Sequence, residues 1–186
     1  MKDEEILDLY WNRSELAIPE TASKYGHYCK EISYNILHSS EDAEECVNDT
    51  WLKTWNNIPP QRPGRLAAFL GRITRNLSLD RYRYYNAAKR GLSQTELALE
   101  ELDECIPAGA RPEEIVEGKM LTELIEKFLL TQPRQKRELF IRRYWYMYSV
   151  KDAAKDMGIK VGTAASILQR MREALKSYLE KEGIEI

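Results

Sequence analysis

The stretch RLAAFLGRITRNLSLDRYRYYNAAKR, residues 65–90, decides the fold of this chain. Its apolar residues recur every three or four positions, which predicts an amphipathic helix with one buried stripe of Leu66, Phe69, Leu70, Ile73 and Leu77. Cationic side chains can bind phosphates, and exposed aromatic rings can stack on unpaired bases. The other side of this helix carries both kinds of residue and therefore indicates a nucleic-acid surface. Its polar and cationic members are Arg72, Arg75, Asn76, Arg83, Lys89 and Arg90, and its aromatic members are Tyr82, Tyr84 and Tyr85. A solvated basic helix without a ligand is the alternative.

The charges are segregated along the 186 residues, although the formal net charge is only −2. Residues 62–90 hold eight bases and one acid, whereas residues 95–128 hold ten acids and three bases. A uniformly basic DNA-binding protein would not show this division. A protein that meets DNA with one surface and a basic partner with another would show it.

Several other classes of protein do not fit the sequence. The three cysteines, Cys29, Cys46 and Cys105, include no CxxC pair, so a disulfide framework is not expected. The spacing of His27 and His38 relative to these cysteines matches no standard zinc site, and we expect no metal or other cofactor. The acidic N-terminus lacks the pattern of a signal peptide, and no apolar run approaches the ~20 residues of a membrane span, which favours a soluble cytoplasmic protein.

The stretch preceding the basic helix is predicted to form a helix over residues 39–57, beginning at a capping box of Ser39 and Asp42. Its buried stripe would be Ala43, Val47, Trp51, Trp55 and Ile58, and the opposite face would carry Glu45, Asn48, Asp49 and Lys53. Such an acidic face is either solvated surface or a docking face for another protein. Two further helices are expected at about residues 4–10 and 19–37.

The residues NIPPQRPG, 57–64, cannot be helical, because they contain three prolines and a glycine. They predict a stiff loop immediately before the basic helix. Such a loop either holds a pocket open at little ordering cost or simply connects two helices.

Residues 91–118 are acidic and contain two prolines and several glycines, which predicts a flexible linker with a faint helical pattern at 95–102. Helices are then expected at residues 119–130 and 134–148. The fold class is therefore all-α, with a four-helix domain at residues 1–90, the linker at 91–118 and a four-helix domain at 119–186.

The stretch SVKDAAKDMGIKVGTAASILQRMREALK, residues 149–176, has the pattern of a helix-turn-helix. Ala154 is small where a second helix must approach, and Gly158 follows four residues later at the turn. An inward face is predicted for Val161, Ala164, Ile167, Leu168 and Met171. A face turned toward a major groove is predicted for Thr163, Ala165, Ser166, Gln169, Arg170 and Arg172.

Three segments in this order resemble the bacterial RNA polymerase sigma factors of the sigma-70 family, in the extracytoplasmic-function (ECF) type. DAEECVNDTWLKTW, residues 42–55, is similar to the helix that docks on core polymerase, and FLGRITRNLSLDRYR, residues 69–83, to the helix that melts the promoter. Residues 149–175 resemble the helix-turn-helix that reads the −35 element. The resemblance covers about residues 20–90 and 119–180.

The resemblance implies a promoter-specificity factor without catalysis of its own. Its partners would be promoter DNA, core RNA polymerase through the β′ clamp and β flap, and an anti-sigma factor. It implies polymerase contacts for Asp42, Glu45, Asn48, Asp49 and Trp51. It implies contacts to the −10 element for Arg62, Arg65, Arg72, Arg75, Asn76, Tyr82 and Arg83, with the loop at 58–65 and Asn76 enclosing a flipped base.

For the −35 element the resemblance implies Thr163, Ala165, Ser166, Gln169, Arg170 and Arg172. Many relatives carry Lys or Arg at the positions of Ala165 and Ile167, so specificity here is expected to depend on Ser166, Gln169 and Arg170 together with DNA shape.

Two competing hypotheses are a stand-alone helix-turn-helix regulator that binds duplex DNA and an enzyme that acts on nucleic acid. The basic aromatic helix suits melted DNA, which disfavours the first. No catalytic constellation stands near that helix, which disfavours the second.

Overall fold

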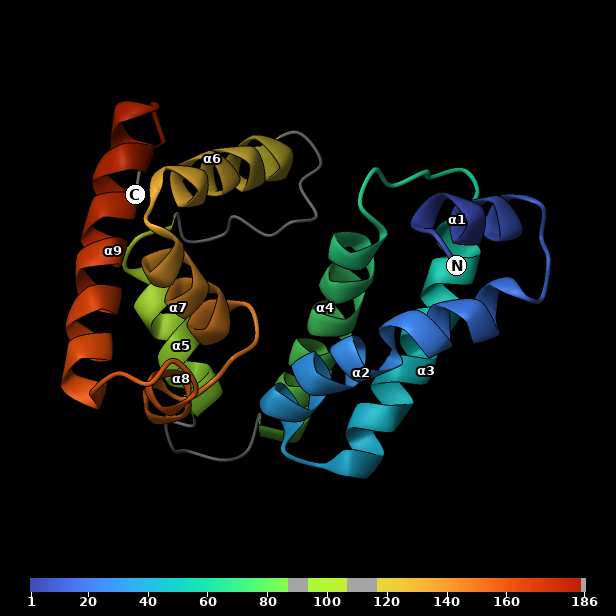
Figure 1. Ribbon diagram of the computed structural model, residues 1–186, viewed down its shortest axis with the longest axis horizontal. Coiled ribbons are helices and arrows are strands. Elements are labelled where there is room, and N and C mark those ends of the chain that lie inside the picture. Colours follow the sequence, from blue (N-terminus) through green and yellow to red (C-terminus); the bar gives the residue numbers. More distant parts are fainter. Residues whose placement is uncertain (87–93, 107–116, 185–186) are drawn as a thin grey trace. The chain divides into compact units, whose positions relative to one another are not determined.

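The computed structural model describes residues 1–86, 94–106 and 117–184, and every regular element in these ranges is an α-helix (Figure 1). The chain divides into two compact units, Met1–Arg90 and Gly91–Ile186. The all-α prediction is thus confirmed. The cysteines Cys29 and Cys46 are buried in the first unit as free thiols, and no group of metal-ligating side chains is found in the part of the chain that is described.

The first unit consists of α1 (Asp3–Trp11), α2 (Ala17–Leu37), α3 (Ser40–Asn57) and α4 (Leu66–Asn86). Helix α2 packs against both α3 and α4, which lie beside each other (Figure 1). The predicted cap at Ser39 is present, since its hydroxyl accepts a hydrogen bond from the Asp42 amide at 3.2 Å. The stripe expected from the basic stretch is also confirmed, because Leu66 and Leu70 are fully buried.

Small hydroxyl side chains fill the space where these helices approach closely. Thr50 of α3 and Thr74 of α4 lie 3.1 Å apart, and Ser78 of α4 donates to Ser33 of α2 at 2.8 Å. These buried hydroxyls also hydrogen-bond backbone carbonyls of their own helices, as Thr74 does with Leu70. Their polar groups therefore have hydrogen-bond partners although they are buried.

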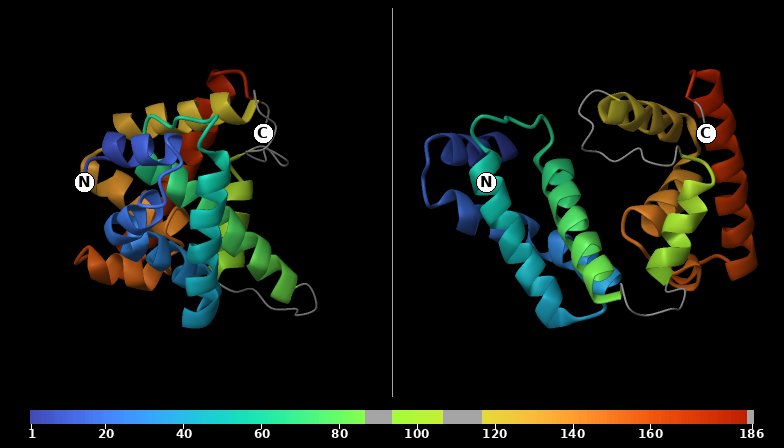
Figure 2. Two further views of the ribbon diagram at one scale, coloured as in Figure 1. Left: turned by 90° about the vertical axis from the view of Figure 1, so that its right-hand side faces the viewer. Right: turned by 180° about the vertical axis from the view of Figure 1, so that it is seen from behind.

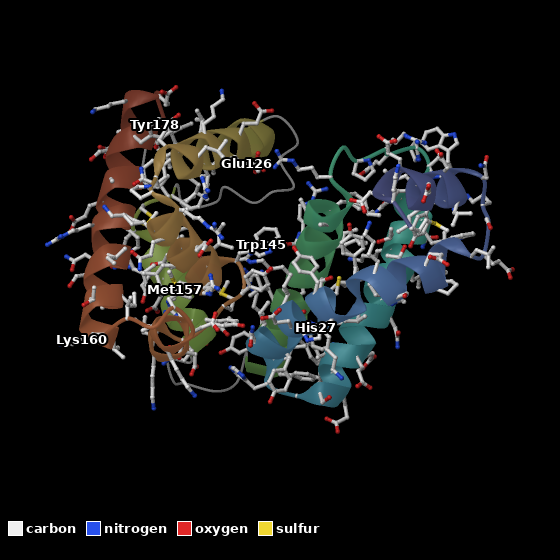
Figure 3. The ribbon with its side chains drawn as sticks, in the orientation of Figure 1. His27, Glu126, Trp145, Met157, Lys160 and Tyr178 are labelled. Atoms are coloured by element: carbon white, nitrogen blue, oxygen red, sulfur yellow. The ribbon has the colours of Figure 1, made fainter. Side chains whose placement is uncertain are left out.

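The second unit contains α5 (Gln94–Asp103), α6 (Glu117–Thr131), α7 (Arg134–Tyr144), α8 (Val150–Asp156) and α9 (Val161–Lys181). Helix α9 carries the core residues Leu168, Met171, Leu175 and Leu179. Near its C-terminal end the ring of Tyr178 lies 5.7 Å from that of Phe128 in α6 (Figure 3).

The predicted helix-turn-helix is present as α8 and the first half of α9. Ser149 caps α8 by accepting a hydrogen bond from the Asp152 amide at 3.0 Å, and Ala154 is fully buried. Gly158 adopts a φ of 65°, the left-handed conformation that glycine takes without strain.

Helix α5 lies within the segment predicted as a linker, at the place of the faint helical pattern. It packs beside α7 in the second unit (Figures 1 and 2). Thr95, Ala98 and Cys105 are buried there, so this side of the segment belongs to a folded core. The remaining linker residues 91–93 and 107–116 lie outside the described residues, as do Lys89 and Arg90.

Three details of the sequence prediction are wrong. Helix α7 ends at Tyr144 rather than Tyr148, because the backbone turns at Met147, which has a φ of 57°. Val161 is 48% exposed as the first residue of α9 instead of packing inward, and Tyr82 is buried instead of exposed.

Within the described part of the chain, none of the helices has the length and apolar character needed to cross a membrane.

Candidate nucleic-acid and protein interfaces

The acidic face of α3 is paired with Arg81 of α4, a residue that the sequence analysis did not single out. Arg81 Nη1 donates to Glu45 Oε2 at 2.7 Å and lies 3.6 Å from Asp42 Oδ1, and Nη2 lies 3.8 Å from Asp49 Oδ2. Three acids predicted to bind polymerase thus converge on one guanidinium. Because Arg81 lies at a helical distance of three and seven residues from Ser78 and Thr74, its position next to the α3 interface could have been deduced from the pattern.

This pairing changes the ionisation of the residues involved. The hydrogen bond from Arg81 lowers the pKa of Glu45 and raises that of Arg81 itself. Tyr85 donates to Asp42 at 3.2 Å, which raises the pKa of Tyr85. Glu45 is therefore ionised at neutral pH, and Arg81 partly neutralises its charge.

The two other residues predicted to bind polymerase differ in accessibility. Asn48 is exposed on α3 beside Glu45, whereas Trp51 is only 6% exposed and belongs to the core. Trp51 would act through the position of α3, while Asn48 is open to a partner.

The outer side of α4 presents cations and two exposed rings. Arg65, Arg72 and Arg83 are exposed; Arg72 lies over the Phe69 ring at 5.7 Å, and Arg83 pairs with Asp80 at 3.5 Å. Tyr84 and Tyr85 are 81% and 50% exposed, with their ring centroids 5.9 Å apart. These rings, rather than Tyr82, are accessible for stacking on bases.

Arg75, Asn76 and Tyr82 are less accessible than predicted. Arg75 and Asn76 are half-buried, and burial together with the charge of Arg83 lowers the pKa of Arg75 to about 10. Tyr82 is 8% exposed, because it follows Ser78 by four residues and so continues the buried stripe.

The loop between α3 and α4 begins at Ile58, which is fully buried, and then becomes exposed from Pro60 to Arg62. Arg62 does not extend freely into solvent. Its Nη2 atom lies 2.6 Å from Asp8 Oδ1 of α1, and its guanidinium lies over the Trp11 ring at 5.7 Å. The loop is thus connected to the N-terminal helix.

The outer face of α9 begins next to its N-cap residue Lys160, close to the α8–α9 turn (Figure 3). Five predicted residues are exposed along this helix: Thr163, Ala165, Ser166, Gln169 and Arg170. Ser166 donates to the Gly162 carbonyl at 2.9 Å, and Gln169 donates to Glu173 at 3.1 Å. These are local contacts on the helix surface, so the side chains can exchange them for contacts with bases.

Arg172 lies apart from this set. Its Nη1 atom donates to the Tyr144 hydroxyl at 2.7 Å and lies 3.5 Å from Glu101 Oε2 of α5. Its side chain is only 17% exposed and is engaged by α5 and α7, whereas the other five residues are exposed.

Glu101 joins α5, α7 and α9 through a buried polar network. Its Oε1 atom accepts from Arg143 Nη2 at 3.0 Å, and its Oε2 atom accepts from Arg143 Nε at 3.2 Å and from the Tyr144 hydroxyl at 2.8 Å. Arg143 is only 1% exposed and also donates to the Tyr148 carbonyl at 2.9 Å. Burial opposes the ionisation of Glu101, but the donors from Arg143 and Tyr144 outweigh it and lower its pKa.

Comparison with protein families matches the two units separately. Sigma-70 region 2 matches residues 22–88 and Sigma-70, region 4 matches residues 123–175. The first match includes α3 and α4 with the loop between them, and the second includes α7, α8 and most of α9. Helices α1 and α5 lie outside both matches.

Two relatives are similar over most of the chain. The ECF RNA polymerase sigma factor SigE of Mycolicibacterium smegmatis is 27% identical over 154 residues, covering 83% of this chain and 58% of that protein. The ECF RNA polymerase sigma factor SigW of Bacillus subtilis is 27% identical over 155 residues, covering 80% of this chain and 81% of that protein. The chain thus spans little more than half of the first relative and most of the second. With both regions matched in order on two helical units, the chain belongs to the sigma-70 family of RNA polymerase sigma factors, in its ECF type.

Proposed function

We propose that this protein is a promoter-specificity factor that binds core RNA polymerase, recognises the −35 and −10 elements and helps to open the DNA. The observation that carries the proposal is the order of the two matched regions, each on its own helical unit with an exposed surface of suitable chemistry. Catalysis would belong to the polymerase, and the protein would act in the cytoplasm, where polymerase and DNA are found.

The acidic face of α3 is the proposed docking surface for the polymerase β′ clamp. Glu45 and Asn48 are exposed there, and Glu45 is held ionised by Arg81. Complementary charge would accelerate encounter with a basic partner and select its orientation. The second unit would contact the β flap, which would bring α9 to the upstream DNA.

The outer side of α4 is the proposed surface for the melted −10 element. Arg65, Arg72 and Arg83 would contact phosphates, and Asn76 with the loop at 58–65 would enclose a flipped base. The exposed Tyr84 and Tyr85 add stacking surfaces. Thr163, Ser166, Gln169 and Arg170 would read base edges of the −35 element, with Ala165 leaving room for close approach.

An anti-sigma factor is the third proposed partner. A protein that covers the α3 acidic face and the α4 cations would block polymerase and DNA together. The segregation of charge in the sequence supports a partner with the opposite arrangement of charges.

The test is transcription from fragmented genomic DNA by purified core polymerase with and without this protein, followed by sequencing of transcript starts. We expect new starts that share two motifs near −35 and −10. The variant Glu45→Gln should reduce their yield at limiting protein. Glu41→Gln, at an exposed acid in the first turn of the same helix, is the matched control and should leave the yield unchanged.

Two outcomes would contradict the proposal. The absence of both polymerase binding and new starts would remove the sigma-factor function. Tight, sequence-specific binding of duplex DNA by the free protein, combined with that absence, would favour a stand-alone helix-turn-helix regulator.

A further inference from the structure

The C-terminal end of α1 contacts the loop at residues 58–65 through the side chain of Arg62. Asp8 and Trp11 both contact Arg62. Asp8 forms an ion pair of 2.6 Å with it, and the Trp11 ring centroid lies 5.7 Å from its guanidinium carbon. Carboxylate and ring thus both interact with the same guanidinium. This is how arginine binds when it fixes one segment to another.

A second connection reaches the chain immediately before the loop. Arg13, which follows α1, donates from Nη1 to the Trp55 carbonyl at 2.7 Å, and its guanidinium lies over the Trp55 ring at 5.3 Å. Trp55 also lies near Tyr10 of α1, with ring centroids 6.1 Å apart. Trp55 lies three residues before the start of the loop at Ile58, and Arg62 lies four residues after that start. Helix α1 and the turn that follows it therefore contact the chain both before the loop and within it.

Helix α1 is itself firmly attached to the unit. Ile6 and Tyr10 are fully buried and Leu7 is 5% exposed. At the other end of the helix Asp3 accepts hydrogen bonds from Lys24 and Tyr25 of α2, each at 2.6 Å. A segment held by α1 is therefore held to the core of the first unit, not to a fraying end.

We propose that α1 is a brace for the loop that reads the −10 element, and that Asp8, Trp11 and Arg13 are positioning residues for promoter specificity. In this arrangement Arg62 is the loop's own anchor and does not contact a DNA phosphate, contrary to the role that the family resemblance implies for it. The inference rests on the proposed function, because it assigns the loop to −10 recognition. A loop held in its bound shape loses less conformational entropy on binding and discriminates more sharply between bases.

The ion pair between Asp8 and Arg62 is weak by itself, because their side chains are 60% and 45% exposed and exposed ion pairs contribute little. The brace therefore depends on several contacts that act on one short loop. Losing one of them should change selectivity modestly without unfolding the unit.

The experiment compares holoenzymes that contain wild-type protein, Asp8→Asn, Arg62→Gln, the double variant, and the exchanged pair Asp8→Arg with Arg62→Asp. Each transcribes a pool of templates with a randomised −10 element, and the readout is the ratio of preferred to disfavoured sequences. Glu4→Gln, at another exposed acid of α1, is the matched control. The salt dependence of holoenzyme binding to one preferred promoter is measured in parallel.

We expect Asp8→Asn and Arg62→Gln each to lower the discrimination ratio about two- to fivefold, the range that an exposed ion pair supports. The double variant should be no worse than either single variant, and the exchanged pair should recover most of the lost discrimination. The salt slope should stay unchanged in Arg62→Gln. A slope that falls by about one in Arg62→Gln, with a normal ratio in Asp8→Asn, would overturn the brace and make Arg62 a phosphate ligand.

Hydrogen exchange on the free full-length protein separates this inference from the proposed function. Asp8→Asn and Arg62→Gln should both accelerate exchange of the Gln61 amide, which donates to the Asn57 carbonyl at 3.0 Å, while Glu4→Gln should not. Unchanged exchange would overturn the brace even if transcription succeeds. Accelerated exchange without new transcript starts would retain the brace and remove the sigma-factor function.

Discussion

Arg81 of α4 donates a hydrogen bond of 2.7 Å to Glu45 of α3, and so connects the proposed polymerase-docking helix to the proposed promoter helix. The Arg81 side chain is 18% exposed, whereas the Glu45 side chain is 64% exposed. The acid therefore remains open to a partner while the arginine is set back between the helices. A basic group of polymerase that approaches Glu45 must compete with Arg81 for the same oxygen atoms.

Replacing Arg81 with Gln should strengthen binding to core polymerase, because it removes this internal competitor. An exposed pair contributes about 0.2–1 kcal/mol, so we expect the dissociation constant to fall by up to about fivefold. The measurement is a titration of fluorescently labelled protein with core polymerase at low and high salt. Arg83→Gln, an equal change of charge on the same helix, should have little effect in the absence of DNA. Weaker binding by Arg81→Gln would show instead that Arg81 itself contacts polymerase.

Replacing Glu101 with Gln should loosen α5 and α7. The amide keeps the size of the side chain but leaves Arg143, which is 1% exposed, without its counter-ion. We expect the opening free energy of α5 and α7 to fall by about 2 kcal/mol. Hydrogen exchange resolved by segment measures this, with α2 and α4 as internal controls. Glu100→Gln, the exposed neighbour on α5, should leave the exchange of both segments unchanged.

The contribution of Glu101 should depend on pH in a defined direction. Its pKa lies below the ordinary value of 4.5, so the unfolded state binds the proton more readily than the folded state. The stabilisation is thus complete above about pH 4.5 and is lost as pH falls through the lower folded-state pKa. The difference in opening free energy between wild type and Glu101→Gln should accordingly be constant from pH 5 to 7 and shrink below that range. A difference that grows on acidification would contradict the assignment.

Arg170 and Arg172 should respond differently to replacement by Ala. Arg170 is exposed on the outer face of α9, so its loss should weaken transcription from promoters that depend on the −35 element, by about tenfold if it contacts a base. Arg172 contacts Tyr144 and Glu101, so its loss should mainly accelerate hydrogen exchange in α5. Transcription from the same promoters measures the effect of Arg170→Ala, and hydrogen exchange in α5 measures the effect of Arg172→Ala. Equal −35 defects in the two variants, with normal exchange in both, would place Arg172 at the DNA after all.

The helices of this protein could be predicted from sequence because their signals are local. The stripe from Leu66 to Leu77 has the helical period, Ser39 and Ser149 begin helices as caps, and Gly158 marks the turn of the helix-turn-helix. Each of these signals depends on neighbours within four residues, and the structure confirms all of them.

The side-chain partners could not be predicted in the same way, because they join residues far apart in the chain. Asp8 and Arg62 are 54 positions apart, and Arg143 and Glu101 are 42 positions apart. Nothing near Arg62 in sequence distinguishes it from a cation that contacts phosphate. The acidic composition of α5 likewise indicated side chains exposed to solvent. The Glu101 carboxylate instead lies in a network with residues of α7 and α9, which forms only when these helices pack together.

The docking of α5 also determines how much chain is available to connect the two units. Only seven residues, 87–93, separate the end of α4 from α5, and a connection of that length reaches at most about 27 Å. If the Glu101 network opened and α5 were released, residues 87–116 would form a tether of up to about 100 Å. A short tether holds the second reader at a high effective concentration near the first, whereas a long one tolerates wider spacing at lower avidity. If the two units bind a promoter as proposed, the Glu101 network would thus set the range of distances over which both units can contact the DNA at once.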